Sequence, residues 1–142
     1  MTLKFLKPTT PGQRGTVLVS KSHLWKGDPY KSLLRSQHST GGRNNQGRIT
    51  SRRMGGGVKR KYRIIDFKRS KFDMAAEVIR NEYDPNRSAF ISLIKYTDGE
   101  FNYIISPQKI KVGDKVISGQ NVEIKEGNCL PLKNIPVGSS IH

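Results

Sequence analysis

The segment from residue 35 to residue 63 lacks what a chain needs to build a core of its own. It holds nine Arg and Lys, six Gly and no Asp or Glu. Before Val58 its only aliphatic apolar residues are Ile49 and Met54. So few apolar groups cannot offset the entropy lost when the backbone is ordered. We therefore predict that residues 35–57 form an arm, mobile alone and ordered on a partner.

Charge is divided unequally between the two halves of the chain. Residues 1–72 carry 18 Lys and Arg and two acids, whereas residues 73–142 carry eight and nine. This concentration favours a nucleic acid, an anionic membrane or an acidic protein as the partner. A membrane is disfavoured, because no apolar run approaches the ~18 residues of a spanning helix and the basic segment has no apolar face.

Residues 58–134 have the pattern of a small all-β domain. Short apolar stretches alternate with turn signals, among them Asp98-Gly99, which favours a tight hairpin. Residues 73–85 also fit a helix, but the alternation in "AEVIRNEYD" favours a strand. The strands we expect in this domain are 61–69, 76–84, 88–96, 101–106, 112–119 and 121–127, with a further short strand in "TVLVS" near the N-terminus.

Five or six short strands in about 75 residues predict a small antiparallel barrel, OB-like or SH3-like, because closure removes exposed strand edges. The fold class we adopt is all-β, an OB-like barrel with a long basic N-terminal extension. We expect residues 1–57 to form this extension, residues 58–134 the barrel, and residues 135–142 the start of a connection to a further domain.

The basic residues of the arm and of the first expected strand are closely enough spaced to follow a phosphate backbone. The Arg guanidinium pairs bidentately with phosphate, and the interspersed glycines allow the main chain to approach RNA closely. Amide side chains such as Asn44 can read base edges or 2′-hydroxyls. The alternative is a solvated tail. The candidate RNA-binding cations of this region are Arg43, Arg48, Arg52, Arg53, Lys59, Arg60, Lys61 and Arg63.

Arg87 follows a turn at Asp84-Pro85-Asn86, and two interpretations of it stay open. It can pair with Asp84 or Glu82 at the surface, or it can form a second RNA contact beside the arm. The aromatic residues of the expected strands are similarly open, since they can stack on unpaired bases but more often belong to a core. They are Tyr62, Phe67, Tyr83, Tyr96, Phe101 and Tyr103.

Nothing in the sequence predicts an enzyme or a metal site. The acids of the second half fall at turns or on polar strand faces, and the three histidines stand at no ligand-like spacing. The single cysteine, Cys129, lies in the apolar context "NCLPL" and is expected to be a buried core residue. We expect no cofactor, apart from structural Mg²⁺ held through RNA.

Several motifs occur together in one order: "STGGRNNQGRIT", "GGG", "YRIIDFKR", "EYDPNRSAFISLIKYTDGE", "YIISPQKIKVGDKV" and "GNCLPLKNIPVGSSIH". This series resembles the N-terminal half of the large-subunit ribosomal protein L-two family, in its bacterial or organellar form. The resemblance implies an OB-like barrel preceded by an rRNA-embedded extension. It implies binding to large-subunit rRNA, with roles in subunit assembly and translation. By motif it places rRNA contacts at Arg43, Asn44, Arg48, Lys68, Arg69 and Arg87.

Members of that family continue into an SH3-like domain, whereas this sequence stops at His142. We expect that a second chain supplies this domain and that other large-subunit proteins are partners. A split gene points to a mitochondrial rather than a bacterial ribosome. The alternative function is a free-standing OB-type module for single-stranded nucleic acid, which would bind unstructured oligonucleotides through its aromatic face.

Overall fold

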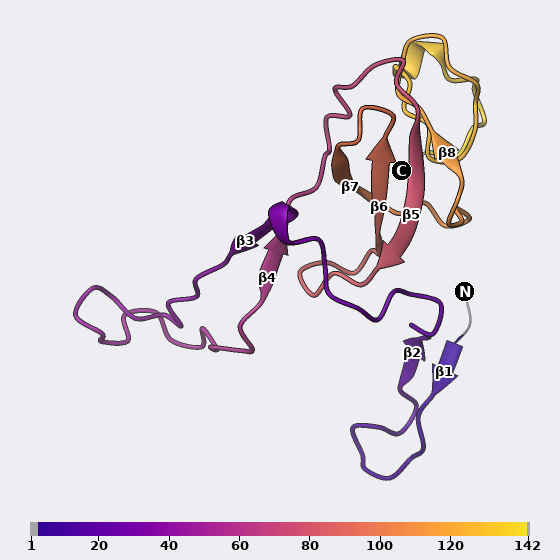
Figure 1. Cartoon of the computed structure of the whole chain (residues 1–142). Coiled ribbons are helices and arrows are strands. Elements are labelled where there is room, and N and C mark those ends of the chain that lie inside the picture. The colour runs from indigo at the N-terminus through magenta and orange to yellow at the C-terminus, as the bar shows by residue number, and fades with distance from the viewer. Residues whose placement is uncertain (1–2, 142) are drawn as a thin grey trace.

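The computed structural model describes residues 3–141 as strands, single-turn 3-10 helices and connecting loops (Figure 1). No helix among these residues has the length and apolar character needed to cross a bilayer. A curled antiparallel sheet follows a long extension, which confirms the all-β, OB-like class. The elements are β1 (Leu3–Phe5), β2 (Val17–Val19), η1 (Lys31–Leu33), β3 (Leu34–Ser36), β4 (Lys61–Arg63), β5 (Ala76–Glu82), β6 (Ile91–Tyr96), β7 (Phe101–Ile105), β8 (Lys115–Val116) and η2 (Leu132–Asn134).

The central sheet has four strands in the order β7-β6-β5-β8, all antiparallel. Its β6–β7 hairpin turns at the expected pair, where Gly99 has φ +89° and donates its N–H to the Tyr96 carbonyl at 2.9 Å. The register of β5 against β6 shifts between Val78 and Arg80. Such an irregularity bends a strand and increases its twist, which helps the sheet to curl.

The alternation in β6 directs its side chains into two different apolar clusters. Ile94 and Tyr96 belong to the cluster inside the curled sheet, which Ala76, Val78, Ile104, Ile110 and Val116 complete. Ile91 and Leu93 point to the opposite face, where they meet Ile65 and Tyr103. Both faces of this strand are therefore buried, so the second face needs a cover from outside the sheet.

The N-terminal extension provides that cover. Tyr30 and Leu33 pack against the second cluster, and the Tyr30 ring lies 4.8 Å from the Phe101 ring, centroid to centroid. The Tyr30 N–H donates to the Tyr103 hydroxyl at 2.9 Å, and this hydroxyl donates to Glu82 Oε2 at 2.9 Å. A part of the predicted extension is thus folded onto the barrel, independently of any partner.

A second set of contacts fixes the chain just before Tyr30. Trp25 donates its backbone N–H to the Asn81 carbonyl at 2.8 Å, and the Arg80 guanidinium lies over the Trp25 ring at 4.8 Å. Arg80 also donates to the Asp28 carbonyl at 3.3 Å and to Glu82 Oε1 at 2.7 Å. These contacts tie the segment to the end of β5.

The expected strand 61–69 divides between the two parts of the molecule. Its first residues form β4, which pairs with β3 through Leu34↔Arg63 and Ser36↔Lys61. Figure 1 shows this two-stranded stem and its long loop extending away from the central sheet. The chain reaches the sheet only at Ile65, which forms a bridge to Tyr103. The predicted boundary between extension and barrel at residue 58 stays a prediction. β4 is one of the two strands of the stem that carries the arm.

The prediction of a strand at 121–127 is wrong, and that at 112–119 is largely so, since only Lys115–Val116 is a strand. The side chain of Asn128 holds the chain from 121 to 128 as a loop. It accepts the Ile117 N–H at 2.9 Å and donates to the Glu123 carbonyl at 2.8 Å. These side-chain bonds replace the ladder that a strand would need.

The prediction that Cys129 is buried is also wrong, because the residue is exposed. Its backbone bonds to both sides of Ser118: its N–H donates to the Ile117 carbonyl and its carbonyl accepts the Gly119 N–H, each at 3.0 Å. The backbone pairing therefore fixes the segment, and the side chain faces outward.

Removing the Tyr103 hydroxyl tests how the extension is held. Tyr103→Phe leaves Glu82 without one donor and the Tyr30 N–H without its acceptor. We expect the free energy of unfolding to fall by about 1–3 kcal/mol in urea denaturation at neutral pH. Tyr83→Phe is the matched control, since Tyr83 is exposed and its hydroxyl makes no hydrogen bond within residues 3–141. Equal losses in the two variants would contradict this account.

The same variant should lose its effect at high pH. Burial raises the pKa of Tyr103 to about 12, whereas an unfolded tyrosine titrates near about 10. The neutral phenol is thus favoured in the folded state, and its stabilisation is fully present below about pH 10. It is lost as the pH rises toward 12, so the difference between wild type and Tyr103→Phe should shrink over this interval.

Candidate nucleic-acid interface

The tip of the arm is a compact turn organised by Asn44. The Asn44 Oδ1 accepts the backbone N–H groups of Gln46 and Arg48, each at 3.0 Å. The Asn44 N–H donates to the Arg48 carbonyl at 2.9 Å, and a bridge joins Arg43 to Ile49. The side-chain oxygen of Asn44 is therefore committed to the turn, and only its Nδ2 remains for the expected RNA contact.

Gly42 allows the two sides of this turn to come together. Its φ is +75°, and a Cβ added there would lie 2.2 Å from the Ser51 carbonyl oxygen. Its own carbonyl accepts the N–H groups of Thr50 at 2.9 Å and Ser51 at 3.2 Å. Only glycine combines this backbone conformation with so close an approach.

The cations of the arm project from this turn and its flanks without acidic partners. The four arginines of residues 43–53 are exposed, as are Lys59, Arg60 and Lys61. Within residues 3–141, ion pairs involve other cations, and none of these seven takes part. A projecting loop whose positive charges are not neutralised by acidic residues is suited to binding a polyanion. The arginines concerned are Arg43, Arg48, Arg52 and Arg53.

The "YDPNR" turn holds the root of the arm, by which we mean Arg60 and Lys61 where the arm meets its stem. Asp84 is fully buried and accepts the Asn86 N–H at 2.8 Å and Arg87 Nε at 2.7 Å. The Asn86 Nδ2 donates to the Lys61 carbonyl at 2.9 Å. Arg60 donates to the Pro85 carbonyl at 3.0 Å. The direction of the arm thus depends on a turn of the barrel.

For Arg87 the structure shows the pairing with Asp84, which was one of the two interpretations. Its side chain is 17% exposed and lies over the rings of Tyr62 and Phe67, at 5.7 and 5.9 Å from their centroids. The Nε is occupied by Asp84, so an RNA contact through its other nitrogens stays a prediction.

The remaining predicted site residues differ in how free their side chains are to contact RNA. Lys68 is exposed, whereas Arg69 donates to the Ser118 hydroxyl at 3.1 Å and to the Gly127 carbonyl at 3.3 Å. Arg63 is half-buried and donates to the Lys61 carbonyl at 2.6 Å. Arg69 therefore joins two loops of the barrel, a use that its position in "DFKR" did not indicate.

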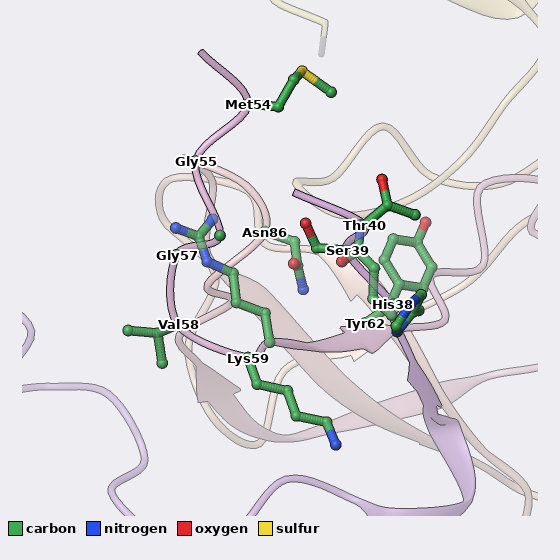
Figure 2. A pocket seen from close by; sticks show the side chains of 13 residues that line it. His38, Ser39, Thr40, Met54, Gly55, Gly57, Val58, Lys59, Tyr62 and Asn86 are labelled. Atoms are coloured by element: carbon green, nitrogen blue, oxygen red, sulfur yellow. The ribbon is translucent and has the colours of Figure 1, made fainter. Parts of the chain in front are cut away.

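An open hollow of about 910 Å³ lies between the two limbs of the arm. Figure 2 shows Ser39 and Thr40 on one limb, Gly57 and Val58 on the other, and Asn86 between them. Tyr62 also lines it and is 37% exposed. The sequence interpretation did not select Asn86, and it left Tyr62 open between stacking on a base and belonging to a core, although an aromatic inside the basic run "KRKYR" is a signal for RNA binding.

Residues 3–141 contain no group of three or more His, Cys, Asp and Glu side chains placed to hold a metal ion. The fold and the arm instead define a class: small β-barrel proteins with a basic extension suited to nucleic acid.

Comparison with known proteins gives the family. Residues 30–118 match the family model described as "Ribosomal Proteins L2, RNA binding N-terminal domain". The chain belongs to this family, which confirms the resemblance found in the sequence.

Relatives match over the whole of the chain. It is 61% identical to the large ribosomal subunit protein uL2 of Paracoccus denitrificans and to that of Ruegeria pomeroyi, each over 142 residues. It is 62% identical to the protein of that name from Rickettsia rickettsii. The match covers 51–52% of these proteins. The chain therefore spans about half the length of the curated relatives it matches.

The turn at the tip of the arm can be tested with two glycine variants. Gly42→Ala should displace residues 42–51, because the new methyl group would meet the Ser51 carbonyl. The expected result is a large change in their amide NMR resonances, with those of β5–β7 unchanged. Gly47→Ala is the control: it has φ +78°, but nothing lies within 4 Å of its added Cβ. Similar changes in both variants would show that close packing at Gly42 is unimportant.

Proposed function

We propose that this chain is a structural constituent of the large ribosomal subunit that binds large-subunit rRNA and supports subunit assembly and translation. The observation that carries the proposal is the set of exposed arm cations, none of which is paired with an acid of the described chain. Membership of an RNA-binding domain family supports it, as do relatives named large ribosomal subunit protein.

In the mechanism, the arm neutralises closely packed phosphates while the barrel fixes the position of the arm. Each Lys or Arg that meets a phosphate releases condensed counterions, which favours binding. The "YDPNR" turn holds the chain where it leaves the arm, and the Tyr30–Tyr103–Glu82 hydrogen bonds hold the extension just before the arm begins. Holding the arm at its root reduces the entropy lost when RNA orders it.

The partners we propose are large-subunit rRNA, other large-subunit proteins and the other half of the family's fold. The matched region covers 51% of the first of these relatives, and a second chain that supplies the SH3-like domain stays a prediction. Mg²⁺ would bind through the rRNA. The relatives named above are bacterial, so they support a ribosomal location without favouring mitochondria. The mitochondrial matrix stays a prediction. We propose no enzymatic activity.

The alternative, a free-standing module for single strands, is not favoured. It would use the aromatic residues of the sheet, but Tyr96 and Tyr103 are buried and Phe101 packs on Tyr30. Competition separates the two functions, since a ribosomal protein should prefer folded rRNA and a single-strand module should prefer an unstructured oligonucleotide.

Salt dependence tests the electrostatic mechanism. If about six to ten phosphates are contacted, affinity for an rRNA fragment should fall by about 10³–10⁵-fold between roughly 50 and 200 mM salt. The measurement is a filter-binding or anisotropy titration at several salt concentrations. A slope near zero in a plot of log affinity against log salt concentration would exclude phosphate neutralisation as the mechanism.

Deleting the loop of the arm tests whether the arm or the barrel provides most of the rRNA binding. Residues 37–60 can be replaced by Asn-Gly, because Ser36 and Lys61 are paired and a two-residue turn can join them. We expect most rRNA affinity to be lost while urea denaturation shows a barrel of similar stability. A deletion variant that kept wild-type affinity would show that the arm is not the main contact.

A further inference from the structure

The hollow between the limbs of the arm has no acidic lining residue, and its floor is formed by the barrel turn. His38, Lys59 and Arg60 line it together with small and polar residues and the apolar Met54 and Val58. One wall is the triple glycine 55–57, where an added Cβ would meet nothing within 4 Å at any position. The hollow is therefore positively charged, open to solvent and, at about 910 Å³, large enough for a group the size of a nucleotide.

Tyr62 offers a flat apolar surface in this basic setting. The ring lines the hollow and is not covered by the core. The Arg87 guanidinium lies over the ring, and the bond from Arg87 Nε to buried Asp84 holds that guanidinium in place. Arg35 is the cross-strand partner of Tyr62 and shares its face of the β3–β4 stem. A supported aromatic ring flanked by cations is suited to stacking with a nucleobase.

Asn86 presents an acceptor to the same hollow. Its Nδ2 donates to the Lys61 carbonyl and to Asp84 Oδ1, so the orientation of the amide is fixed. Its Oδ1 accepts no hydrogen bond from any residue between 3 and 141. A phosphate has only acceptors and cannot bond to this oxygen, but a base amino group or a ribose 2′-hydroxyl can.

We propose that this hollow binds one unpaired RNA nucleotide, with its base stacked on Tyr62, a base amino group or ribose hydroxyl donating to Asn86 Oδ1, and its phosphate near Lys59 and Arg60. Bases inside a duplex are stacked on each other and cannot reach the ring, so the nucleotide lies in a loop, a bulge or a junction. The inference rests on the proposed function, because it names the part of the rRNA that the root of the arm holds.

The first test compares two substitutions of Tyr62 in the full chain, using transcribed large-subunit rRNA as the probe. Tyr62→Leu removes the aromatic face and should weaken binding by about 5- to 150-fold, the range expected for the loss of one base–aromatic stack. Tyr62→Phe keeps the face and should bind within about twofold of wild type. The salt slope should be the same in all three proteins, because stacking neutralises no phosphate.

The second test uses the wild-type chain and needs no variant. Irradiation of its rRNA complex at 254 nm, followed by mass spectrometry, should give a crosslink between Tyr62 and a nucleotide that chemical probing of the free rRNA shows to be unpaired. A crosslink from Tyr62 to a nucleotide within a helix would overturn the proposal. So would a Tyr62→Leu variant that binds as tightly as wild type.

These outcomes separate the inference from the function on which it rests. If wild-type protein binds rRNA with a steep salt slope but Tyr62→Leu has no effect, the nucleotide site is wrong and the rRNA-binding function stands. If wild-type protein shows neither affinity for rRNA nor a salt slope, the proposed function itself fails.

Discussion

The buried carboxylate of Glu82 is the constraint on which the rest of the molecule depends. It is 3% exposed, and an ionised carboxylate at such a position must be matched by donors. Arg80 and Tyr103 provide them, at 2.7 and 2.9 Å. The same two residues hold the extension, through the Asp28 carbonyl and the Tyr30 N–H. Because the two residues that donate to Glu82 also bind the extension, the hydrogen bonding of this one carboxylate fixes where the extension leaves the barrel.

A second buried acid, Asp84, fixes the position of the arm in a similar way. Asp84 is matched by Arg87 and Asn86, and Asn86 in turn holds the backbone of Lys61 at the root of the arm. Both buried acids are neutralised by arginines close to them in the sequence. The cations of the arm are consequently left without acidic partners among the described residues, and their charge remains available for phosphate. In the function we propose, the barrel contributes to RNA binding mainly by positioning the arm, and the arm contributes mainly by its charge.

The sequence predicted the features that depend on local patterns. Alternation of apolar residues marked β6, and the Asp98-Gly99 pair marked its hairpin with β7, because both are decided within a few residues. The preference for strand over helix at β5 was also confirmed. The family was recognised from motifs such as "TGGRNNQGRIT", whose residues form one turn.

What failed depends on specific hydrogen bonds and packing contacts that the pattern of residue types does not show. The expected strand at 121–127 is a loop, because the Asn128 side chain bonds to the backbone of Ile117 and of Glu123. Cys129 was expected in the core from its apolar neighbours, but backbone pairing beside Ser118 turns its side chain outward. The covering of the sheet by Tyr30 could not be foreseen either, since nothing local to Tyr30 indicates that Tyr103 is its partner. The turn-organising bonds of Asn44 could not be foreseen, because an amide that organises a turn and one that reads a base look alike in sequence, and its RNA contact stays a prediction.

The central claim is that the chain works as a fixed part of the large ribosomal subunit. It is tested most directly by separating ribosomal particles from the source organism on a sucrose gradient and identifying the proteins of each fraction by mass spectrometry. The account predicts that this chain sediments with the large subunit, at one copy per particle. Recovery of the chain only among free proteins at the top of the gradient would contradict it.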